Sequence, residues 1–183
     1  MKYGKMTFGQ TEALINKLGG TKTVEEILSG EIEFFIMTST TKLAVNYDNS
    51  IENLVKDGKY DHINCDITDK NFSSSEKGER VVEFKMFHFM KHMLSDHVIF
   101  EMKNAGFRPA IVKELLSYGK KNTEEQRKHP IVALGSVTKI GDDLYVSCLR
   151  GNDCKRNSQR NASLRYFNLY GWDDYFRFLA VRN

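Results

Sequence analysis

The sequence predicts a single α+β domain preceded by a short extension. Capped amphipathic segments between residues 7 and 121 indicate helices. Alternating and continuous apolar runs at 82–89 and after residue 131 indicate strands. A chain of 183 residues can form one domain with its own core, and 40% hydrophobic with 28% charged residues is typical of globular proteins. We expect a helical and β-rich extension over residues 1–48 and the main domain over 51–183.

The first twenty residues carry the signals of a short helix. Thr7 and Gln10 have the spacing of a capping box, and the helix is expected to end at Gly19. A second box, formed by Thr23 and Glu26, predicts another short helix that begins after Thr23.

The segment that follows is expected to change from strand to loop. Residues 31–38 are β-rich, and residues 43–47 are a candidate partner strand. Residues 48–70 are polar without clear periodicity, and residues 71–79 are expected to form a loop.

The middle of the chain alternates strand and helix signals. Val82, Phe84 and Met86 are separated by charged residues, which predicts a strand through about Phe89. Ser95 can begin a helix that ends near residue 106.

The second half begins with one more helix and then becomes β-rich. Pro109 is expected to be the first residue of a helix that ends near Gly119. Residues 131–138 and 144–149 predict a hairpin, and the apolar residues 176–182 predict a central strand.

Several classes of protein are not favoured by the composition. The chain has three cysteines, an odd number without a CxxC pair, which argues against a disulfide framework and a zinc site. No apolar run approaches the ~20 residues of a membrane helix, and residues 1–8 lack the apolar stretch of a signal peptide. We therefore expect reduced thiols, no membrane span, no cofactor and a cytoplasmic location.

The residue composition changes near position 144. Lys, Gln, Glu, Met and Trp together make up 39 of the first 143 residues but only 3 of the last 40, where the earlier rate gives about 11. None of these five has a codon that ends in a pyrimidine. A segment randomised at the first two bases of such codons would lack them. The composition alone leaves two interpretations open: a diversified segment, or a Tyr/Arg/Asn-rich loop that arose by ordinary drift.

Three separated motifs carry a family resemblance. They are TFGQTEAL at 7–14, GFRPA at 106–110 with PIVALGS at 130–136, and WDDYFRFLAVRN at 172–183. The chain resembles the variable proteins of diversity-generating retroelements, in their small-genome bacterial and archaeal branch. This resemblance implies a prokaryotic or viral ligand-binding protein without catalytic activity. It also implies a C-type lectin-like fold with a hypervariable region at about 147–176.

The resemblance also assigns roles to single residues. Tyrosine offers a large rigid contact area and Asn, Ser and Asp adapt their hydrogen bonds, as in antibody paratopes. The ligand is expected to be a protein, whose identity the sequence does not indicate. The scaffold would include Leu164, Phe167, Trp172, Arg177 and Phe178. The diversified positions would be Arg150, Asn152, Asp153, Cys154, Asn161, Ser163, Arg165, Tyr166, Asn168, Leu169, Tyr170, Asp173, Asp174 and Tyr175.

Three alternatives remain open from the residues alone. A nucleic-acid-binding module would use the arginines and tyrosines of the C-terminal segment, although the acidic residues among them disfavour it. His88 and His92 could begin a metal site, but no HExxH motif is present. A thiol enzyme would need reactive cysteines at Cys148 and Cys154, and no neighbouring base is evident.

Overall fold

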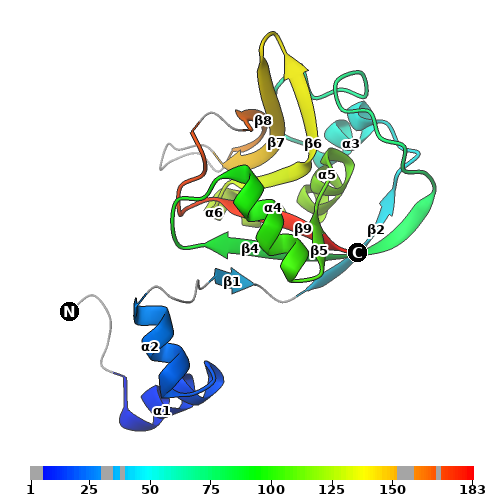
Figure 1. The fold of residues 1–183 in the computed structure, drawn as a ribbon. Helices are drawn as coiled ribbons and strands as arrows, with labels where there is room; N and C mark the ends of the chain where they lie inside the picture. The colour runs from blue at the N-terminus through cyan, green and yellow to red at the C-terminus, as the bar shows by residue number, and fades with distance from the viewer. Residues whose placement is uncertain (1–5, 30–34, 38–39, 152–158, 168–169) are drawn as a thin grey trace. The chain divides into compact units, whose positions relative to one another are not determined.

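The structure divides into two compact units, residues 1–35 and 36–183. It is a computed structural model that describes residues 6–29, 35–37, 40–151, 159–167 and 170–183 (Figure 1). The predicted α+β class is confirmed. The sequence placed residues 41–46 in the extension, but they form a strand of the main sheet, so the second unit begins earlier than residue 51.

Where the structure describes the first unit, over residues 6–29, it forms two short helices, α1 (Phe8–Lys17) and α2 (Thr21–Ser29). The predicted capping box of α1 is present: the Thr7 hydroxyl accepts from the Gln10 amide, and the Gln10 side chain accepts from the Thr7 amide. The second predicted cap is wrong, because α2 starts two residues before Thr23. The Thr23 hydroxyl instead donates back to the Gly19 carbonyl, as a threonine inside a helix can do.

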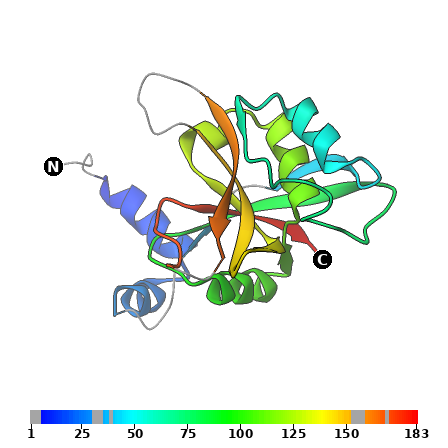
Figure 2. The ribbon, with the colours of Figure 1, turned by 90° about the horizontal axis from the view of Figure 1, so that it is seen from above.

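The second unit is built around one mixed sheet (Figures 1 and 2). Its main strand order is β1-β4-β9-β6-β7-β8-β3, with β2 added on β4 and β5 on β9. The strands are β1 (Phe35–Met37), β2 (Thr41–Asn46), β3 (His62–Ile63), β4 (Glu79–Phe89), β5 (Phe107–Pro109), β6 (Ile131–Ile140), β7 (Asp143–Gly151), β8 (Arg160–Tyr166) and β9 (Arg177–Arg182).

The final strand is central, as predicted. β9 lies between β4, to which it is antiparallel, and β6, to which it is parallel. Four consecutive residues, from Phe178 to Val181, are buried because both faces of the strand are covered. The predicted hairpin is also present as β6 and β7, with a register shift between Ala133 and Val137.

Among its described residues, the second unit has four helices. They are α3 (Ile51–Gly58), α4 (Ser95–Asn104), α5 (Val112–Lys121) and α6 (Glu125–Lys128). The sequence interpretation missed α3, although Ser50 caps it and Ile51, Leu54 and Val55 form its buried face. α3 packs on α5, and both contribute to the main core.

Pro109 does not start a helix, contrary to the prediction. It is the last residue of β5, and α5 begins three residues later. β5 pairs with β9 in a register that places Pro109 opposite Ala180. Sheet pairing therefore outweighs the local preference of proline for the first helical turn. In the described part of the chain, no helix has the length and apolar character needed to cross a bilayer.

Candidate functional site

The exposed tyrosines of the C-terminal segment gather around one hollow. Tyr166, Tyr170 and Tyr175 are 41%, 75% and 48% exposed, respectively. All three line a pocket of about 160 Å³, which we call the aromatic pocket. Its complete lining is Arg165, Tyr166, Tyr170, Gly171, Trp172, Asp173, Tyr175 and Phe176.

Ring contacts order the walls of the aromatic pocket. The Tyr166 ring lies 4.8 Å from that of Tyr145 on the neighbouring strand and meets Tyr170 edge to face, with centroids 6.4 Å apart. Tyr175 stacks on Phe176 at 4.5 Å. Such pairs stabilise an aromatic cluster beyond the area they bury, so the rings of Tyr166, Tyr170 and Tyr175 are held in place while they stay exposed.

The base of the pocket is fixed by buried residues. Trp172 is only 2% exposed and packs edge to face on Phe176 and Phe178. Its indole N–H donates to the Ser95 hydroxyl at 2.9 Å, and that hydroxyl donates to the carbonyl of Phe167. Ser95 is the first residue of α4, so the helix and the C-terminal segment are joined at this point.

Further contacts fix the main chain of the C-terminal segment, residues 170–176. Trp172 and Met93 exchange two backbone hydrogen bonds of 2.8 and 2.9 Å. The Nε2 atom of His92 lies 2.7 Å from the Tyr170 carbonyl oxygen, and that of His88 lies 2.8 Å from the Asp174 carbonyl oxygen. These contacts reach peptide groups and not the side chains of the pocket residues.

Arg177 fixes the main chain at the C-terminal end of the segment, at residues 174–176. Its guanidinium donates to the carbonyls of Asp174, Tyr175 and Phe176 at 3.1 to 3.3 Å. Partial burial lowers the pKa of Arg177, while nearby Asp174 acts in the opposite direction. Burial also lowers the pKa of His88, with Arg177 adding to this effect and the Asp174 carbonyl opposing it. At neutral pH His88 is therefore an uncharged imidazole that can donate from Nε2.

The other expected site residues lie along β8 or outside the described residues. Asn161, Ser163 and Arg165 share one face of the strand because side chains alternate. Asn161 is paired in register with Arg150, which lines a separate small hollow beside α6. Asp174 is exposed beside the pocket. Asn152, Asp153, Cys154, Asn168 and Leu169 lie outside the described residues.

The expected scaffold residues are placed at different depths. Trp172 and Phe178 are buried, and Arg177 is half-buried with three carbonyl acceptors. Leu164 is only partly buried and packs against the core. Phe167 is half-buried as well, and its amide donates to the Leu144 carbonyl.

The sequence interpretation did not identify His88, His92 and Ser95 as supports of the segment. It considered the two histidines only as metal ligands. Each contacts a carbonyl that is more than 70 residues away, and no local pattern signals such a contact. No group of three His, Cys, Asp or Glu side chains able to hold a metal is found among the described residues.

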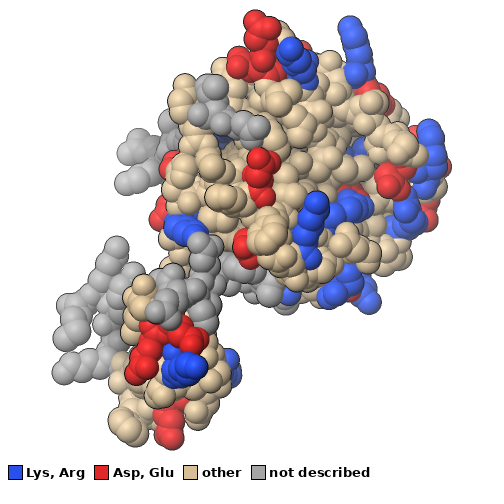
Figure 3. Space-filling model, in the orientation of Figure 1, with Lys and Arg blue, Asp and Glu red and all other residues tan. Residues whose placement is uncertain are grey.

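Arg160, which a nucleic-acid-binding module would use for phosphates, is not available to a ligand. It is 5% exposed, and its guanidinium donates to the carbonyls of Gly58 and Gly119 and to Gln126. On the face shown in Figure 3, basic and acidic side chains are interspersed over the described residues and do not form a continuous basic surface. Both observations disfavour this alternative.

Cys148 does not have the surroundings of a reactive thiol. It is fully buried, and burial raises its pKa to about 12. A thiol in this state is protonated at neutral pH and is a poor nucleophile. Cys65 is exposed.

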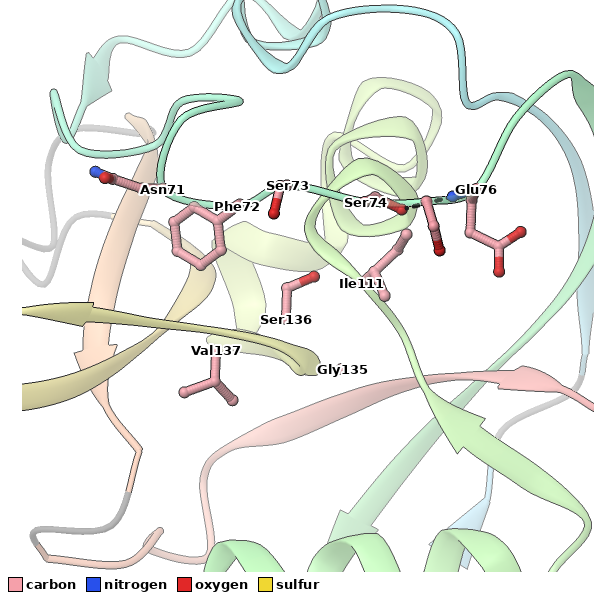
Figure 4. A pocket seen from close by; sticks show the side chains of 10 residues that line it. Asn71, Phe72, Ser73, Ser74, Glu76, Ile111, Gly135, Ser136 and Val137 are labelled. Atoms are coloured by element: carbon pink, nitrogen blue, oxygen red, sulfur yellow. Dashed lines mark hydrogen bonds between the residues drawn. The ribbon is translucent and has the colours of Figure 1, made fainter.

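A second hollow lies between the 71–76 segment and the β6 bulge (Figure 4). It measures about 320 Å³, and none of the expected site residues lines it. Two of its hydroxyls already serve the fold: Ser136 accepts from the Val112 amide, and Ser74 accepts from the Glu76 amide. Glu76 is paired with Arg80. The side chains of Ser74, Ser136 and Glu76 are thus already used by the protein itself.

Comparison with known proteins does not identify the site. The chain matches no protein-family model, no curated protein and no solved structure.

Proposed function

We propose that the protein binds a protein ligand through the aromatic pocket, as a variable protein of a diversity-generating retroelement. The observation that carries the proposal is the way the pocket is held. The backbone of residues 170–176 is fixed by hydrogen bonds to peptide groups, while the tyrosine side chains face outward.

In this arrangement backbone groups stabilise the segment, and the exposed side chains are left to contact a ligand. Every residue type has a backbone carbonyl, so the bonds from His92 to Tyr170 and from His88 to Asp174 would survive replacement of either side chain. Loops on a rigid scaffold can vary when the core does not depend on them. The segment therefore meets the physical requirement for diversification at its exposed positions.

The fixed part of the segment supports the same proposal. Trp172, Phe176 and Phe178 are buried, and they alternate with exposed or half-buried residues. Replacing a buried aromatic residue with alanine typically costs about 3–5 kcal/mol. Selection for folding would hold these positions constant.

The strand arrangement supports a C-type lectin-like scaffold. From β4 onward the order of elements is β4, α4, the short strand β5, α5 and α6, and then the strands β6 to β9; the last strand, β9, returns to pair with β4. Phe84 is in register with Val181 in this pair. The C-terminal segment thus enters β9 in the middle of the sheet, between β4 and β6.

A randomisation experiment tests the proposal directly. Codons ending in a pyrimidine are placed at residues 166, 170, 173, 174 and 175, and thermal unfolding of the purified variants is measured. Most variants should still fold cooperatively, with a loss of no more than about 2 kcal/mol from the ring pairs that the substitutions remove. The matched control randomises Trp172, Phe176 and Phe178, where most variants should fail to fold.

The result that contradicts the proposal is equal intolerance in the two libraries. Sequencing of the neighbouring DNA gives a second test. It should contain a reverse transcriptase gene and a near-copy of the 3′ end of this gene that differs chiefly at adenines.

A further inference from the structure

Arg165 differs from the other arginines around the sheet. Its guanidinium lies 5.9 Å from the centroid of the Phe176 ring, in the lining of the aromatic pocket. Among the described residues, no carboxylate or carbonyl accepts a hydrogen bond from it. Acceptors of this kind are present for Arg80, Arg108, Arg160, Arg177 and Arg182.

The surroundings of Arg165 determine what it can bind. The side chain is half-buried, so water only partly solvates its charge. A guanidinium has five donors in a planar fork that matches the two oxygens of a carboxylate. An acceptor that enters the pocket would therefore receive hydrogen bonds that the Arg165 guanidinium does not make within the fold.

The size of the pocket limits the ligand. A volume of about 160 Å³ lies below the roughly 300–1,000 Å³ of small-molecule sites and suits one inserted side chain. Tyr170 and Tyr175 also line the hollow, and a phenol hydroxyl can donate a hydrogen bond to an anion. Tyr, Trp and Arg are also the residues that most often dominate the affinity of protein interfaces.

We infer that the aromatic pocket binds the carboxylate of an Asp or Glu side chain on the partner protein, held by the Arg165 fork. This inference rests on the proposed function and names the chemistry of the ligand in this particular chain. Asp173, which also lines the pocket, is exposed and carries the opposite charge. Its negative charge would lower the affinity for an anion and raise the affinity for a cation. Replacement of Asp173 with Asn therefore distinguishes an anionic ligand from a cationic one.

The test uses NMR titration of the full ¹⁵N-labelled chain with three probes. These are the N-acetyl N-methylamides of glutamate, glutamine and lysine. The signals of the Arg165 Nε–H and of the Trp172 indole N–H report binding, and Trp172 is the single tryptophan of the chain. The glutamate probe should shift both signals saturably and bind about tenfold more tightly than the glutamine probe, because the charge-assisted bond is the stronger one.

Variants provide the controls. R165Q should abolish binding of the glutamate probe, R165K should weaken it because lysine lacks the fork, and D173N should strengthen it severalfold. Arg182 also lies over a phenylalanine ring but is paired with Glu83, so R182Q should leave binding unchanged. If R165Q does not fold, R165K and D173N still decide the question.

Three results would overturn the inference: equal binding of the glutamate and glutamine probes, tighter binding of the lysine probe, or no saturable shift with any probe. None of these would affect the randomisation experiment, because that experiment measures unfolding and not ligand affinity. A failure of the inference is thus distinguishable from a failure of the proposed function.

Discussion

The imidazole of His92 contacts the carbonyl oxygen of Tyr170 at 2.7 Å, across 78 positions of the chain. Tyr170 is the most exposed tyrosine of the aromatic pocket, and His92 lies outside the region expected to vary. A constant side chain thus fixes the backbone of a residue whose own side chain is free to change.

Removing this contact should loosen the segment without unfolding the protein. We expect H92A to lose about 1 kcal/mol, the usual contribution of one hydrogen bond. The Trp172 amide, which donates to the Met93 carbonyl, should then exchange with deuterium severalfold faster. H97A is the control, since His97 is exposed on α4, and it should leave that exchange rate unchanged.

Gly171 should not tolerate a side chain. Its φ of +66° is left-handed, and an added Cβ would lie 2.4 Å from a His92 ring carbon and 2.9 Å from the Met93 carbonyl oxygen. We expect G171A to destabilise the protein by about 1–3 kcal/mol, measured by urea unfolding. G141A adds a Cβ at another left-handed glycine with open space around it, so it should cost less. Equal losses would show that the crowding at His92 is unimportant.

Arg160 should be essential for folding even though it lies in the expected variable region. Its guanidinium satisfies the carbonyls of Gly58 and Gly119 near the ends of α3 and α5, at 2.7 and 2.6 Å. We expect R160M to destabilise by about 3 kcal/mol or more, because buried carbonyls lose their donors. R165M, on the same strand, should cost much less. Comparable unfolding midpoints for the two variants would contradict this assignment.

The buried thiol of Cys148 should make stability depend on alkaline pH. Burial raises its pKa to about 12, whereas an exposed thiol titrates near about 8.5. Above pH 8.5 the unfolded chain loses this proton and the folded chain retains it, so stability decreases as the pH rises toward 12. Urea unfolding between pH 8 and 10 should show a decline that is smaller in C148A. Identical slopes would argue against this contribution.

Much of the fold could be predicted from local patterns. The capping box of Thr7, the alternation that begins at Val82 and the apolar run at 176–182 each depend on residues close together in the chain. Such signals act through backbone geometry and burial within one element, and they correctly indicated α1, β4 and β9. The change in composition near residue 144 also marks the part of the chain that contains the aromatic pocket.

Tertiary structure alone decided other features. The position of Pro109 in β5 depends on its pairing with Ala180, and β2 joins the sheet through β4. The sequence could indicate that tyrosines and arginines are abundant after residue 144, but not that Arg165 lines a pocket while Arg160 is buried. Hydrogen bonds and desolvation depend on atoms brought together from distant segments, so these roles arise only when the chain is folded.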